Sequence, residues 1–208
     1  GGIGPFPLTD VTADPATVDA AEAAAEDLVP DFVLTQMADN FEGTIIDDVF
    51  LGPVTQNQTG SGELANTFET GDVMDGGAGR DQLLVDLIQT GTIGDLLGGF
   101  GAAIGARTTS IEEVYLTAIT SQIDLLVTNT TPLSTIDAGR MAGVEQWWTD
   151  ESRSFIQIED IRSLPEETVF GMRLTDPAVG YSAYFNPLFL DTVDTAASAF
   201  SFVIAETG

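Results

Sequence analysis

The chain of 208 residues contains no cysteine, no histidine and no lysine. Without cysteine there is no disulfide and no thiolate chemistry. Without histidine, the usual zinc, copper and haem sites lose their ligands, and Ser-His and Cys-His catalytic arrangements are excluded. A carboxylate pair could still hydrolyse a glycoside, but no pair stands out among the 33 Asp and Glu residues. We therefore expect a protein that is not an enzyme, in which oxygen ligands for calcium or magnesium are abundant.

Positive charge is scarce, because six Arg residues face 33 acids and the formal net charge is −27. Phosphate groups would be repelled everywhere, so we expect no nucleic-acid partner and no attraction to an anionic membrane surface. So many carboxylates also repel one another unless cations or salt intervene. The composition therefore predicts stability that depends on divalent cations, or a solvated acidic surface suited to a saline medium, and the two are compatible.

Long apolar runs are missing as well. A membrane span needs about 18 apolar residues, and the best candidate, residues 93–106, is shorter and contains Asp95. We therefore expect no membrane insertion. The first residues show neither a starting Met nor the pattern of a secretory signal, so the beginning resembles a processed or excised segment of a longer protein.

Residues 1–38 are expected to form an N-terminal arm with a short capping helix. Asp14 suits the N-cap and Pro15 the first helical position, an alanine- and acid-rich run follows to residue 28, and Pro30 ends it. This helix could cap an exposed β core or serve in assembly. The expected second unit is a β domain over residues 39–208.

Short β-type runs dominate that second unit. The expected strands lie at 48–51, 82–88, 111–119, 123–128, 144–149, 155–161, 169–175, 181–185 and 200–205. Several begin about a dozen residues apart, which predicts an all-β fold of right-handed parallel β-helix or β-roll type, although a sandwich has similar intervals. Residues 56–65 read as a polar insertion between two turns. Trp147 and Trp148 would point to opposite faces of one strand, as core residues or as a glycan- or subunit-contact patch.

Residues 76–84 match the glycine-rich nonapeptide G-G-x-G-x-D-x-U-x, which binds calcium between turns of a parallel β-roll. Its glycines allow tight turns that aim carbonyl oxygens inward, and Asp81 adds a carboxylate. An EF-hand is excluded, because acids do not alternate and no Glu occupies the twelfth position. The alternative is a plain turn before a strand. The candidate calcium ligands are Asp47, Asp48, Asp72, Asp75, Gly77, Gly79 and Asp81.

The order of these segments resembles the RTX-type calcium-binding repeat module of bacterial S-layer proteins and large cell-surface adhesins. The resemblance lies in residues 43–50, 70–83, 110–117, 136–138 and 143–145, and it leaves the N-terminal helix outside. The chain departs from that family in having one full nonapeptide and Glu112 where Asn is preferred. The resemblance implies a calcium-stabilised, self-associating structural module at the cell surface or outside the cell. A virion or appendage component and an accessory domain of a secreted hydrolase are the alternatives.

Overall fold

The computed structural model describes residues 30–60, 62–88, 91–92, 103–119, 132–162, 168–174, 184–189 and 200–206. Strands and loops make up all of these residues, so the predicted all-β class is confirmed for them. The predicted helix at 14–28 and the predicted strand at 123–128 lie outside the described residues. Across the ranges given above, no helix has the length and apolar character needed to cross a membrane.

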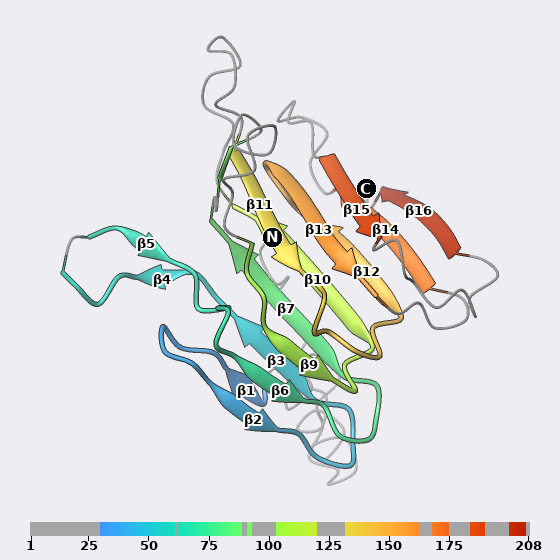
Figure 1. The fold of residues 1–208 in the computed structure, drawn as a ribbon, viewed down its shortest axis with the longest axis horizontal. Helices are drawn as coiled ribbons and strands as arrows, with labels where there is room; N and C mark the ends of the chain where they lie inside the picture. Colours follow the sequence, from blue (N-terminus) through green and yellow to red (C-terminus); the bar gives the residue numbers. More distant parts are fainter. Residues whose placement is uncertain are drawn as a thin grey trace, which may run out of the picture.

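The largest sheet has seven strands, all parallel to their neighbours and arranged in chain order (Figure 1). We call it the main sheet. Its strands are β1 (Phe32–Val33), β3 (Val49–Gly52), β7 (Gln82–Leu87), β10 (Glu113–Ala118), β12 (Gln146–Asp150), β14 (Thr168–Leu174) and β16 (Phe200–Glu206). Five of the predicted strands coincide with β3, β7, β10, β12 and β14, and the prediction at 200–205 coincides with β16.

Between successive strands of the main sheet, the chain forms the strands of two smaller sheets. The first contains β2 (Asn40–Glu42), β6 (Val73–Asp75) and β9 (Arg107–Thr109), which are parallel and again in chain order. The second runs in the order β15 (Tyr184–Phe189), β13 (Phe155–Ile161), β11 (Pro132–Asp137) and β8 (Gly91–Thr92), and only β8 pairs antiparallel. The chain therefore alternates between one long parallel sheet and these two shorter sheets.

The register of the main sheet stacks one buried residue per strand. Phe50 pairs with Leu83, Leu83 with Val114, Val114 with Trp147 and Trp147 with Phe170. Each of these five side chains is at most 2 % exposed. Successive side chains of a strand point to opposite faces, so this row places one face of the main sheet in the core.

The opposite face of the main sheet carries Trp148, as the predicted opposition of the two tryptophans requires. Its ring stacks on Tyr115 at 6.4 Å between centroids, and the Arg173 guanidinium lies 4.7 Å from the indole centroid. Trp148 is only 9 % exposed and Trp147 2 %. Both tryptophans are therefore covered within the single chain.

The polar segment predicted as an insertion forms a hairpin of β4 (Thr55–Gln56) and β5 (Leu64–Ala65), which are antiparallel. It projects to the left of the sheets in Figure 1. At the start of the described residues, β1 pairs with β3, so residues 32 and 33 of the predicted N-terminal arm belong to the main sheet.

Candidate cation site at the stacked corner

Three loops that connect the three-stranded sheet to the main sheet lie on top of one another. They comprise residues 43–48, 76–81 and 110–112, and we call them the stacked corner. Gly43 N–H donates to the Asp75 carbonyl at 2.7 Å, Gly76 N–H to the Thr109 carbonyl at 2.9 Å, and Ala78 N–H to the Thr44 carbonyl at 3.1 Å. These bonds fix successive loops in register, so positions 33 residues apart face each other.

The glycines of the nonapeptide allow this close stacking. A Cβ atom at Gly76 would lie closer than 3.0 Å to both the Ser110 carbonyl oxygen and Asp81 Oδ2. Gly77 has a φ of +92°, where other residues are strained, and a Cβ there would strike the Thr44 carbonyl oxygen. The sequence motif therefore reflects the absence of space between two loops.

Asp81 is the most enclosed acid of the corner, with an exposed fraction of 0 %. Its Oδ1 accepts the Asp48 N–H at 2.8 Å, and its own N–H donates to Glu112 Oε2 at 2.8 Å. Its Oδ2 is buried without a hydrogen-bond partner. Burial raises the pKa of Asp81, the Asp48 N–H bond lowers it, and the nearby negative charge of Glu112 raises it further.

In the preceding turn, both carboxylate oxygens of the equivalent aspartate, Asp48, have hydrogen-bond donors. Asp48 occupies the position 33 residues before Asp81, and both its oxygens accept bonds from Thr44: the N–H at 2.5 Å and the hydroxyl at 3.2 Å. In the next turn Gly77 replaces Thr44, and its N–H donates instead to Asp75 Oδ1 at 3.2 Å. The threonine hydroxyl is thus missing beside Asp81, whose second oxygen remains open.

The other predicted ligands are distributed unevenly. Asp47 and Asp75 are exposed at the corner, and Asp47 Oδ1 accepts the Arg80 N–H at 2.8 Å. Gly79, with a φ of +144°, packs against the backbone of Ile46. Asp72 lies at the opposite end of β6 from Asp75, away from this corner.

Asp72 is buried with both oxygens occupied. It accepts the Asp39 N–H at 3.0 Å and the Glu69 N–H at 2.7 Å. Burial raises its pKa, while these two backbone bonds lower it. Asp72 therefore holds two loops together through backbone amides, in contrast to Asp81.

The donor set of the corner suits a hard cation, and its centre is Asp81. The Oδ2 atom and the Ser110 carbonyl oxygen both approach Gly76 from the same side, and oxygen atoms of both kinds are calcium ligands. Among the described residues, however, no group of three or more Asp and Glu side chains is already gathered in a metal-binding arrangement. The carboxylates of Asp47, Asp48 and Asp75 instead accept hydrogen bonds from backbone N–H groups.

Sequence reasoning missed three features of the corner. Glu112 reaches it from the third loop, and Arg80 bridges Glu113 at 2.5 Å and Glu145 at 3.0 Å. The closed Thr44–Asp48 arrangement was also missed. A usable signal was present, because Thr35 and Asp39 repeat it nine residues earlier, with the Thr35 N–H donating to Asp39 Oδ2 at 2.6 Å.

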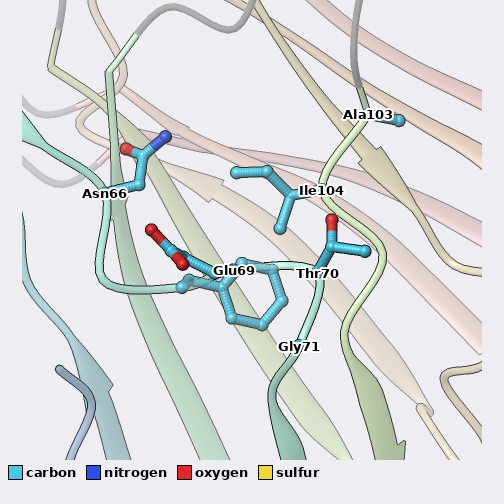
Figure 2. Close-up of a pocket in the computed structure, with 7 residues that line it drawn as sticks. Asn66, Glu69, Thr70, Gly71, Ala103 and Ile104 are labelled. Atoms are coloured by element: carbon cyan, nitrogen blue, oxygen red, sulfur yellow. The ribbon is translucent and has the colours of Figure 1, made fainter. Parts of the chain in front are cut away.

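A separate open hollow of about 450 Å³ begins at Asn66, directly after β5 of the hairpin, and Figure 2 shows the residues that line it. Its polar groups already serve the fold: Asn66 Oδ1 accepts the Ile88 N–H at 2.8 Å, and Thr70 Oγ1 accepts the Gly105 N–H at 3.1 Å. Glu69 is the one titratable residue of its lining. The lining consists of Asn66, Phe68, Glu69, Thr70, Gly71, Ala103 and Ile104.

No family model matches this chain, and no match was found among curated proteins or solved structures. In the described part of the chain, the stacked corner combines a buried carboxylate, that of Asp81, with a specific sequence motif, the nonapeptide.

Proposed function

We propose that this chain is a calcium-stabilised structural module, without enzymatic activity, of an extracellular or cell-surface assembly. One observation carries the proposal: Asp81 Oδ2 is buried and unpaired between loops whose glycines match the calcium-binding nonapeptide. An unsatisfied buried acceptor costs about 1–3 kcal/mol, and a cation bound to Asp81 Oδ2 would remove this cost.

The parallel sheets support the finer architecture that we propose, a right-handed parallel β-helix with β-roll-like corners. Strands of the main sheet follow the chain order, and the hydrogen bond from Asp48 to Asp81 joins residues 33 apart. In such a coil each turn buries its apolar face against the next turn. Repetition of this kind suits an elongated scaffold that associates with further copies.

In this proposal Asp81 and the Ser110 carbonyl hold the ion, and Asp47, Asp48, Asp75 and the carbonyls of Gly77 and Gly79 are the nearby oxygens that complete its shell. The ion supplies positive charge and no reaction. It offsets both the burial of the Asp81 carboxylate and the negative charges of Glu112, Asp48 and Asp47, which together raise the pKa of Asp81. Binding and ordering of the loops are then coupled, because the ligands meet only when the turns are stacked.

The weak calcium affinity expected of extracellular modules, on the order of 10⁻⁴ to 10⁻³ M, fits a protein that functions outside the cell. Binding to the folded state alone stabilises it by about 2.7 kcal/mol at a calcium concentration of 100 times Kd. This stabilisation is large enough to be measured as a shift in Tm.

The test is thermal unfolding with calcium and with a chelator, on the wild type, Asp81→Asn and the control Asp86→Asn. Asp86 lies on β7, and Asp86→Asn removes the same charge without touching the corner. Calcium should raise the Tm of the wild type and of Asp86→Asn but not that of Asp81→Asn. In chelator Asp81→Asn should be more stable than the wild type, because the neutral amide keeps an oxygen for the Asp48 N–H and leaves no buried negative charge at the position of Oδ2. A calcium shift of equal size in all three proteins, or in none, contradicts the proposal.

A further inference from the structure

The β4–β5 hairpin presents a polar turn away from the sheets (Figure 1). Its strands pair with each other through Thr55 with Ala65 and Gln56 with Leu64. Gln36 fastens it, since its Nε2 donates to Thr55 Oγ1 at 2.6 Å and to the Gln56 carbonyl at 2.7 Å. Gln58, Thr59 and Gly60 at the tip are exposed. The hairpin is thus held at one side while its tip remains accessible.

The sequence at this tip is Asn57-Gln58-Thr59, which has the N-x-S/T pattern, with x other than proline, of an N-glycosylation acceptor. Asn57 Oδ1 accepts the Thr59 N–H at 2.9 Å, and Asn57 N–H donates to the Glu63 carbonyl at 2.7 Å. The asparagine side chain is therefore engaged by the threonine of its own sequence pattern, in an Asx turn. The pattern and its local geometry coincide on an exposed turn.

We propose that Asn57 is an acceptor site for an N-linked oligosaccharide. The co-substrate is a lipid-diphosphate-linked sugar used by a membrane oligosaccharyltransferase. Asn57 Nδ2 forms a bond to the anomeric carbon, the bond from that carbon to the diphosphate oxygen breaks, and its electron pair leaves with the diphosphate. The transferase takes up the Nδ2 proton, and no oxidant or reductant is needed.

The hydrogen bond to Oδ1 favours this step, because it draws electron density toward the oxygen and makes the Nδ2 protons more acidic. The position also suits a bulky product. Asn57 is half-buried, directly follows β4 and adjoins the exposed residues 58–60 of a hairpin whose strands pair only with each other. A glycan on Asn57 therefore extends past this turn into solvent without displacing core residues. The inference rests on the proposed extracellular location, since such transferases act on exported chains, but not on calcium.

The test uses the 208-residue chain, secreted from a eukaryotic host with a glycosylated reporter domain fused to it. Peptide mass spectrometry before and after peptide-N-glycosidase measures occupancy at Asn57. Asn57→Gln and Thr59→Ala should abolish the modification, whereas Thr59→Ser and Gln58→Ala should retain it. A second N-x-T pattern begins at Asn129, outside the described residues, and Asn129→Gln separates its contribution.

Occupancy at Asn57 that is lost in both disrupting variants supports the proposal. A secreted, folded chain whose reporter is glycosylated while Asn57 is bare overturns it. If the chain is retained in the cell, the purified folded protein is incubated with transferase and lipid-linked oligosaccharide. A control peptide in the same reaction shows that the transferase is active. Absence of transfer to Asn57 while the control peptide is modified also overturns the proposal. Calcium dependence is measured separately by thermal unfolding. If the calcium proposal fails, the occupancy of Asn57 can therefore still be interpreted.

Discussion

Gly171→Ala provides a sharp test of the outer face of the main sheet. Gly171 pairs with Trp148 across β12 and β14, and the indole lies directly over it. A Cβ at this position would be closer than 3.0 Å to three ring atoms, so the indole must move. Moving it strains three contacts of Trp148: its stacking on Tyr115, the approach of Arg173, and the hydrogen bond from Nε1 to Gln146 Oε1 at 2.9 Å.

The expected cost follows from these contacts. Overpacking a filled site costs about 1–3 kcal/mol, and the aromatic pair and the cation–π contact contribute about 0.5–1.5 and 0.5–1 kcal/mol. After the indole has moved, part of the energy of the aromatic pair and of the cation–π contact is retained. Replacing glycine by alanine also stabilises the protein by about 0.4–1 kcal/mol, because it restricts the unfolded chain. We therefore expect Gly171→Ala to lower the free energy of unfolding by about 1–3 kcal/mol.

Gly52→Ala is the matched control. Gly52 is also a buried strand glycine, but a Cβ there would meet its nearest neighbour, Phe68 Cβ, at an ordinary 3.4 Å. We expect this variant to be neutral or slightly stabilised. Urea unfolding followed by tryptophan fluorescence measures both effects. Equal destabilisation by the two substitutions, or a Gly171→Ala protein with wild-type stability and an unchanged spectrum, would refute the packing described here.

Two further predictions concern single side chains. Burial, followed by the hydrogen bond from its hydroxyl to Glu113, raises the pKa of Tyr115 from 10.0 to about 12. Because the folded value is the higher one, stability should be complete below pH 10 and fall as the pH rises toward 12; alkaline urea titrations of the wild type and Tyr115→Phe should show this loss in the wild type alone. Asp72→Asn should lower stability by about 1–3 kcal/mol equally with calcium and with chelator, because one of two buried backbone donors loses its acceptor; a calcium-dependent difference in Tm would place Asp72 at the ion.

Most of the longer strands could be predicted from the sequence because their side chains alternate, whereas the six-residue strand β11 was not predicted. In β7 every second residue from Leu83 is buried, and this period of two is visible in the sequence. The three-residue strands β2, β6 and β9 were missed, since three residues carry too little pattern. These segments are strands because they pair with the equivalent segments of neighbouring turns. Phe41 pairs with Met74, and Met74 pairs with Thr108.

The nonapeptide identified the stacked corner but not the state of each carboxylate. Asp72 and Asp75 are close in sequence, but Asp72 directly precedes the short strand β6 and Asp75 ends it. Asp72 is also fully bonded to backbone amides. The difference between Asp48 and Asp81 depends on one hydroxyl of Thr44, which Gly77 lacks. Such pairings depend on the register of stacked turns, which a single sequence does not specify.

Calcium stoichiometry tests the central proposal most directly. Equilibrium dialysis at millimolar calcium, with the bound metal measured by elemental mass spectrometry, should find an ion bound to the wild type and to Asp86→Asn that Asp81→Asn fails to retain. A wild-type chain that binds no calcium at these concentrations, or an Asp81→Asn chain that binds as much as Asp86→Asn, would contradict the assignment of the ion to the stacked corner.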